Sequence, residues 1–93
     1  MLNRRIHSLR TALGWSQVEL AQRLQVSKQT VSNWENDNIQ PSVDMLVRIA
    51  GVFGVATDYL LGLDDTPRLN VDGLTPAAVA HLSQLIEDLR AKE

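Results

Sequence analysis

Apolar residues recur at spacings of three and four along nearly the whole of this 93-residue chain. That spacing places them on one face of an α-helix, whereas a half-buried strand would alternate apolar and polar residues. No stretch of the sequence alternates convincingly in that way. The periodicity therefore predicts an all-α fold. Each short helix then needs a neighbour, because a single helix cannot bury its apolar face alone.

Residues that start and stop helices divide the first 62 positions into five short segments. The candidate N-caps are hydroxyl side chains, namely Ser16 (in a capping box with Glu19), Ser27, Ser42 and Thr57. The expected helices span residues 2–13, 17–24, 28–36, 43–53 and 58–61. Because the connections are tight, these segments predict one compact domain, residues 1–62.

The rest of the chain predicts a linker and one further helix. Residues 63–73, "LDDTPRLNVDG", are polar, acidic and rich in turn formers. Residues 74–93 open with Thr75 as an N-cap and Pro76 at the first helical position. The apolar face of this amphipathic helix is formed by Val79, Leu82, Leu85, Ile86 and Leu89. This face can bind a second copy of the chain, fold back on the first domain or bind another protein.

The second and third expected helices are joined by a turn of only three residues, 25–27. Ala21 is small where the two helices must approach closely, and Val26 is apolar and fills the corner of the turn. Val31 and Trp34 are expected to point inward from the third helix. This pattern predicts a helix-turn-helix, a motif whose second helix enters the major groove of DNA.

The outward side chains of the third helix suit base recognition. The amides of Gln29 and Asn33, one turn apart, can pair with N6 and N7 of adenine. Lys28 can bind guanine or a phosphate. The alternative interpretation of these residues is an ordinary solvated helix face.

The formal net charge of -2 conceals an asymmetry. Residues 1–36 hold five basic and two acidic groups, whereas residues 37–93 hold four basic and nine acidic groups. This distribution favours a basic face that meets a polyanion. Arg5, like Arg4, is a candidate phosphate contact, and the alternative is an ordinary solvated side chain.

Other classes of function lack the residues that they need. The chain has no cysteine for a disulfide or a thiolate zinc site, and neither His7 nor His81 has a set of metal ligands nearby in the sequence. No nucleophile with a base and no phosphate-cradling glycine loop is visible. We therefore expect no enzyme activity, metal or cofactor. Since the first residues contain no long apolar stretch, we also expect a cytoplasmic protein without a membrane partner.

Several motifs follow one another in order, namely "SQxELA", "VSxxTVSxWE", "LxxIAxxFGV" and "DYLLG". On these motifs the chain resembles the phage repressor/Cro-type (xenobiotic-response-element-like) family of helix-turn-helix transcriptional regulators over residues 4–62. The resemblance implies a five-helix lambda-repressor-like DNA-binding domain.

Carried over by position, the resemblance implies a set of DNA contacts. The implied base contacts are Lys28, Gln29, Thr30, Ser32 and Asn33. The implied phosphate contacts are Gln17, Asn36 and Asn38. Arg10 and Glu35 match a pair that forms an internal salt bridge in the family. Gln25 and Asp37 stand where the family commonly has glycine, at positions that tend to need a positive φ, and Asp37 can also repel a phosphate.

The sequence thus predicts a sequence-specific, double-stranded DNA-binding transcriptional regulator, most simply a repressor that binds a palindromic operator as a homodimer. Dimerisation through residues 74–93 is favoured because one recognition helix reads too few base pairs, and two-fold symmetry doubles the contacts. The alternatives are an antitoxin that represses its own operon and a protein-interaction module that uses the same fold. A regulatory protein partner is compatible with each of these functions.

Overall fold

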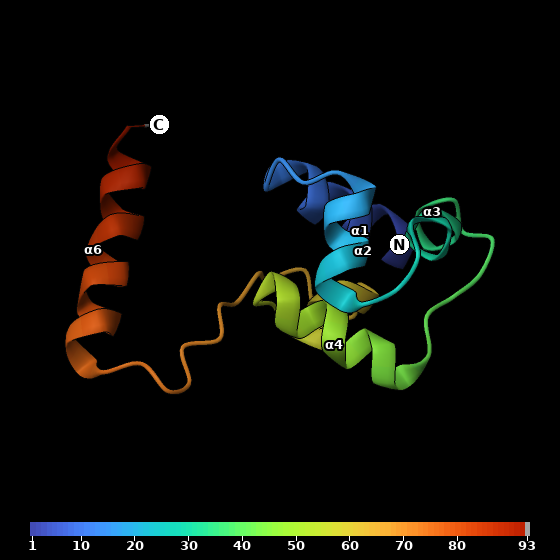
Figure 1. The fold of residues 1–93 in the computed structure, drawn as a ribbon. Coiled ribbons are helices and arrows are strands. Elements are labelled where there is room, and N and C mark those ends of the chain that lie inside the picture. Colours follow the sequence, from blue (N-terminus) through green and yellow to red (C-terminus); the bar gives the residue numbers. More distant parts are fainter. Residues whose placement is uncertain (93) are drawn as a thin grey trace.

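The computed structural model describes residues 1–92, which form six helices and no strand (Figure 1). The helices are α1 (Leu2–Ala12), α2 (Gln17–Leu24), α3 (Lys28–Glu35), α4 (Val43–Phe53), α5 (Thr57–Leu61) and α6 (Pro76–Ala91). The all-α prediction is confirmed. α1 and α3 each end one residue earlier than expected, since Leu13 and Asn36 are their C-caps.

The hydrophobic core lies among α1 to α5. Its fully buried side chains include Ile6 from α1, Leu20 from α2 and Ile49 from α4. α2 packs against α3, while α1 contacts both α3 and α5. Val31 and Trp34 are buried in this core, as predicted, and so they fix which face of α3 points outward.

Of the four N-caps predicted within residues 1–62, three are confirmed. The hydroxyl of Ser16 accepts from the backbone N–H of Glu19 at 3.1 Å, and Ser27 and Ser42 cap α3 and α4 in the same way. The predicted cap at Thr57 is wrong. Thr57 is the first residue of α5, and the N-cap is Ala56, whose extended backbone (φ -74, ψ 149) opens the helix without a side-chain hydrogen bond.

Gln25 and Asp37 both adopt a left-handed backbone, with φ of 59° at each position. The chain reverses tightly at these points: the N–H of Val26 donates to the carbonyl of Ala21 at 2.9 Å, and that of Asn38 donates to the carbonyl of Asn33 at 2.9 Å. These bonds satisfy carbonyls at the helix ends. The prediction of positive φ is confirmed at both positions, each at a cost of about 1 kcal/mol relative to glycine.

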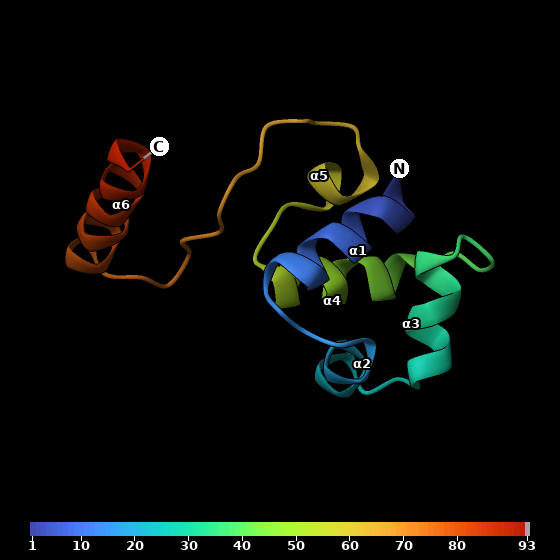
Figure 2. The same cartoon turned by 90° about the horizontal axis from the view of Figure 1, so that it is seen from above.

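α6 stands apart from the five-helix body (Figure 2). It begins as predicted, with the Thr75 hydroxyl accepting from the N–H of Ala78 at 3.1 Å. None of its described residues is buried, and Leu85 and Leu89 are 52% and 54% exposed. Residues 63–73 form neither helix nor strand.

No helix among residues 1–92 combines the length and the apolar character needed to cross a bilayer.

Candidate nucleic-acid interface

The outward face of α3 presents the polar side chains expected to meet bases. Lys28 and Gln29 are exposed, while Thr30, Ser32 and Asn33 are half-buried. The hydroxyl of Thr30 is 2.8 Å from that of Ser27, the N-cap of the same helix. The Ser27 hydroxyl thus contacts both the backbone and the side chain of Thr30 in the first turn of α3, the end of a recognition helix that meets base edges.

Gln29 and Asn33 are hydrogen-bonded to each other. The Nε2 of Gln29 donates to the Oδ1 of Asn33 at 3.0 Å. This bond leaves the Oε1 of Gln29 as an acceptor and the Nδ2 of Asn33 as a donor, both on the exposed side of the helix. Adenine offers a complementary donor at N6 and acceptor at N7 in the major groove.

The residues at and after the end of α3 offer side chains rather than backbone amides. The N–H groups of Asn36 and Asn38 already donate to the carbonyls of Ser32 and Asn33, each at 2.9 Å. The side chain of Asn36 donates to the Ser32 hydroxyl at 3.3 Å, and Asn38 is exposed. A phosphate contact from either residue therefore has to come from its carboxamide.

Arg10 and Glu35 form the predicted internal salt bridge, which joins α1 to α3. The Nε of Arg10 lies 2.6 Å from the Oε2 of Glu35, and its Nη2 lies 2.9 Å from the Oε1. The Nη1 donates to the carbonyl of Trp15 at 2.7 Å. Only 4% of the Glu35 side chain is exposed. Both charges are therefore committed to the fold.

Two more donors converge on the same carboxylate. The Nδ1 of His7 lies 2.9 Å from the Oε1 of Glu35, and the Nε2 of Gln17 donates to that atom at 3.2 Å. Burial by itself raises the pKa of Glu35, but the hydrogen bonds from Arg10, His7 and Gln17 outweigh it and hold the pKa below its usual value. Gln17, a predicted phosphate contact, thus has one amide hydrogen engaged inside the protein.

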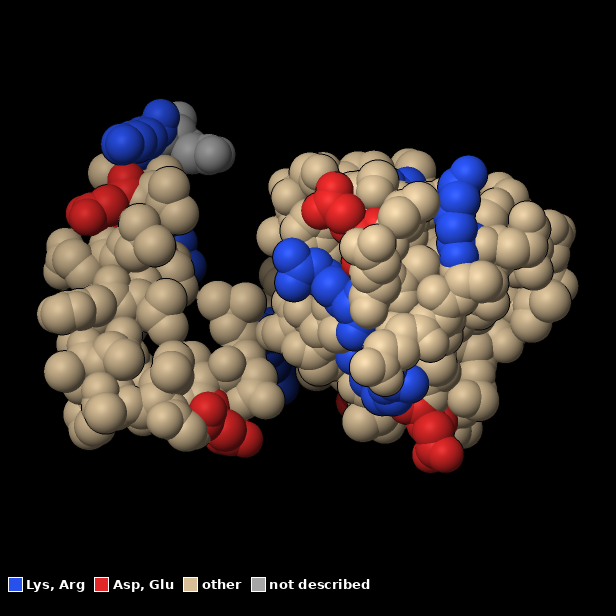
Figure 3. Space-filling model, in the orientation of Figure 1, with Lys and Arg blue, Asp and Glu red and all other residues tan. Residues whose placement is uncertain are grey.

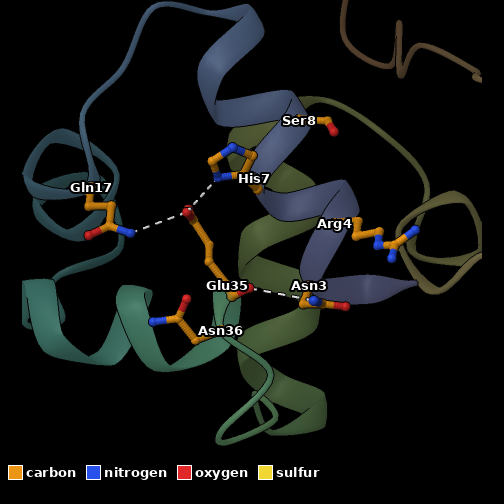
Figure 4. A pocket seen from close by; sticks show the side chains of 7 residues that line it. All are labelled: Asn3, Arg4, His7, Ser8, Gln17, Glu35 and Asn36. Atoms are coloured by element: carbon orange, nitrogen blue, oxygen red, sulfur yellow. Dashed lines mark hydrogen bonds and ion pairs between the residues drawn. The ribbon is translucent and has the colours of Figure 1, made fainter.

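A pocket of about 450 Å³ opens above this cluster (Figure 4). It is lined by Asn3, Arg4, His7, Ser8, Gln17, Glu35 and Asn36. His7 and Gln17 point toward the Glu35 carboxylate, whereas the guanidinium of Arg4 is turned away from it (Figure 4). Sequence reasoning missed this pocket because its walls come from three helices, and only Gln17 and Asn36 had been singled out as DNA contacts.

The guanidinium of Arg5 makes contacts within the protein. Its Nη1 donates to the carbonyl of Tyr59 at 2.7 Å, its Nη2 lies 2.9 Å from the carboxylate of Asp65, and the guanidinium sits 3.9 Å above the Tyr59 ring centre. These contacts tie α1 to the end of α5. The Arg5 guanidinium is therefore engaged within the protein, and its phosphate role stays a prediction.

Fewer basic side chains of residues 1–36 are free to contact DNA than the number of arginines and lysines suggests. Arg23 lies 4.0 Å from the ring centre of Trp15, which is in turn stacked on Phe53. In Figure 3 some lysine and arginine side chains lie close together across the five-helix body, while others stand apart, with acidic groups among them.

Comparison with known proteins shows to which family the chain belongs. A helix-turn-helix family model matches residues 6–60. The chain is 31% identical over 87 residues to the HTH-type transcriptional regulator ImmR of Bacillus subtilis (strain 168), covering 94% of this chain and 68% of ImmR.

Two solved structures of DNA complexes have the same fold. One is the P22 c2 repressor with a synthetic operator, at 28% identity and a TM-score of 0.65, covering 69% of this chain and 97% of that one. The other is SinR, described as a master regulator for biofilm formation, at 32% identity and a TM-score of 0.61, covering 66% and 98%. Both resemble the five-helix part of the chain.

Proposed function

This chain belongs to the Cro/repressor-type helix-turn-helix family of DNA-binding transcriptional regulators, and from that premise we propose that it is a repressor that reads a palindromic operator as a homodimer. The observation that supports base-specific reading most directly is the bonded pair of Gln29 and Asn33 on the outward face of α3.

The amide pair favours adenine in the half-site. Since each amide fixes the other, the acceptor of Gln29 and the donor of Asn33 are held in position before DNA arrives, and less side-chain entropy is lost on binding. Lys28 precedes the pair on the same exposed face and supplies a donor to guanine or a phosphate. Thr30 and Ser32 lie beside these residues as secondary contacts.

Phosphate contacts would hold the C-terminal end of α3 in place on the DNA. Gln17 is the first residue of α2, where backbone N–H groups lack helical partners and attract anions. The side chain of Gln17 contacts Glu35, the last residue of α3, and Asn36 and Asn38 follow that same end of the helix. Asp37, between these two asparagines, is exposed and repels phosphate, so the backbone must pass it at a distance.

Dimerisation is assigned to α6. Val79, Leu82 and Ile86 lie at helical spacing and are only half-covered, with Leu85 and Leu89 exposed beside them. An apolar face of this kind gains free energy when a second copy covers it. α6 lies beyond the end of the five-helix body opposite α3 (Figure 1), so pairing through α6 leaves both α3 helices free.

Two recognition helices related by a two-fold axis reach half-sites about 34 Å apart, one turn of DNA. Occupancy of such a site excludes other proteins from it. This mode of repression requires no chemistry from the protein itself.

A selection of random double-stranded oligonucleotides with the full chain tests the proposal. We expect an inverted repeat with half-site centres about 10 base pairs apart. Gln29→Ala and Asn33→Ala should each relax the preference at one position of the half-site, by about 1–3 kcal/mol.

The matched control is Gln84→Ala, which removes an amide from α6 that contacts only Asp88. It should select the same operator as the unchanged protein. If the unchanged protein enriches no sequence, or if both α3 variants select the same operator as it does, the proposal fails.

A further inference from the structure

The pocket above Glu35 holds a histidine whose second ring nitrogen is free of the carboxylate. We propose that this pocket receives a backbone phosphate of the bound DNA and that His7, in its protonated form, is a direct ligand of that phosphate. The inference rests on the proposed function, and it adds a contact from α1 that makes operator affinity depend on pH.

The location of the pocket identifies the ligand. Gln17, at the start of α2, and Asn36, the C-cap of α3, line it, and both are phosphate contacts in the proposed complex. A phosphodiester that contacts both carboxamides must lie in or over this pocket. His7 lines the same pocket from α1, and its side chain is 57% exposed. His7 is therefore within the space that the phosphate would enter.

The contact with Glu35 fixes the state of the inner ring nitrogen. An ionised carboxylate only accepts hydrogen bonds, so the Nδ1 of His7 bears a hydrogen in its 2.9 Å contact with the Oε1 of Glu35. The Nη2 of Arg10 is 3.3 Å from the same Nδ1, but it donates to the Oε1 of Glu35 at the shorter distance of 2.9 Å. In the neutral ring the outer nitrogen, Nε2, is then an acceptor and repels a phosphate oxygen. In the protonated ring Nε2 becomes a charged donor. Binding a phosphate at Nε2 therefore requires a proton on His7.

The charged groups around His7 do not cancel the positive charge of its protonated ring. The charged groups that face His7 are Arg4 and Arg10 on α1 and Glu35 on α3, while α2 contributes the neutral Gln17. Arg10 and Glu35 neutralise each other, and Glu35 is almost fully covered. Arg4 lies at the rim with its guanidinium turned away from Glu35 (Figure 4). Histidine is thus the residue type lining this pocket whose charge can change near neutral pH.

Binding of the full chain to its selected operator, measured by fluorescence anisotropy across salt at pH 5.5 and pH 8.0, tests the inference. Each phosphate neutralised adds about 0.9 to the slope of log affinity against log salt. We expect the slope to be steeper by about one at pH 5.5, and the affinity at fixed salt to be about tenfold higher.

His7→Asn separates a phosphate ligand from a structural residue. Asparagine can keep a donor near the position of Nδ1, and so retain the bond to Glu35, but it has no outer nitrogen. This variant should lose the pH dependence of the salt slope. His81→Asn on α6 removes the other histidine of the chain and should leave that dependence unchanged. A His7→Asn protein that keeps the full pH dependence overturns the inference.

A second measurement needs no variant at His7. Calorimetry of operator binding near pH 6.5, in two buffers with different ionisation enthalpies, should show net proton uptake both by the unchanged protein and by His81→Asn. Zero uptake by both proteins also overturns the inference. If the unchanged protein prefers no DNA sequence at either pH, the proposed function fails as a whole. If it binds its operator with one salt slope at both pH values, only the role of His7 fails.

Discussion

Arg10 meets Glu35 through two parallel contacts, Nε to Oε2 at 2.6 Å and Nη2 to Oε1 at 2.9 Å, and so fixes α1 against the end of α3. Because both side chains are nearly covered, removal of one partner leaves an uncompensated charge inside the protein. Arg10→Met is expected to lower the free energy of unfolding by about 3 kcal/mol, measured by urea denaturation at neutral pH.

Arg90→Met is the matched control for that measurement. Arg90 pairs with Glu87 on the surface of α6, where both side chains are mostly exposed. A surface pair of this kind contributes about 0.5 kcal/mol or less. Equal losses in the two variants would show that the Arg10 pair has no special structural role.

Glu35 should make the domain sensitive to acid. Its pKa is held below the ordinary value of 4.5, so the native state favours the carboxylate more than the unfolded chain does. That stability is fully present above pH 4.5 and is lost as the pH falls through the lowered pKa. Thermal unfolding between pH 3 and pH 6 should show the loss, and Glu35→Gln should have a shallower acid dependence. Glu87→Gln, which changes an exposed carboxylate, should follow the unchanged protein.

Gln25→Gly should stabilise the domain. Glutamine at φ 59° costs about 1 kcal/mol that glycine avoids, although glycine also makes the unfolded chain more flexible. We expect a net gain of about 0.5 kcal/mol in urea denaturation, with operator binding unchanged because Gln25 lies in the turn before α3. Gln22→Gly, inside α2, should instead destabilise by about 1 kcal/mol.

Gln29 and Asn33 should act on DNA as one unit. Since the Nε2 of Gln29 donates to the Oδ1 of Asn33, either alanine substitution also frees the other amide. A double-mutant cycle of operator affinity should therefore give an interaction energy of about 0.5 kcal/mol or more. Strict additivity would indicate that the two amides contact DNA independently.

Replacing apolar residues on α6 should separate the dimer without unfolding the domain. Leu82→Glu with Ile86→Glu is expected to give monomers in sedimentation experiments and a large loss of operator affinity. The melting temperature of the five-helix body should be unaffected, because no described residue of α6 is buried. Ala80→Glu with Gln84→Glu adds the same charge to the opposite face and should leave the dimer intact.

The sequence predicts best what depends on neighbours along the chain. The caps at Ser16, Ser27 and Ser42 each involve an N–H three residues later, and all three were found. Positive φ at Gln25 was predicted from the family resemblance, since glutamine itself disfavours that conformation. At α5 the local preference was misleading: a hydroxyl is favoured over alanine at an N-cap, yet Ala56 is the N-cap and Thr57 is the first residue of the helix.

Contacts between distant residues could not be predicted in this way. Arg5 was interpreted from its charge, yet its partners Tyr59 and Asp65 are more than fifty positions away. The pocket beside His7 likewise exists only once three helices have packed. Gln17 and Asn36 could be identified from the sequence as phosphate contacts, but the pocket that they line together with His7 could not.

Residues 63–73 form neither helix nor strand, and they separate α6, which is assigned to dimerisation, from the five-helix domain, which is assigned to DNA binding. Eleven residues of irregular chain have a typical span of about 18 Å. In a dimer joined through α6, each reading domain would be tethered rather than fixed, and binding of one would raise the local concentration of the other at the adjacent half-site. The DNA, rather than a rigid protein interface, would then set the distance between the two domains. The same dimer could therefore bind operators whose half-site spacing differs by one base pair.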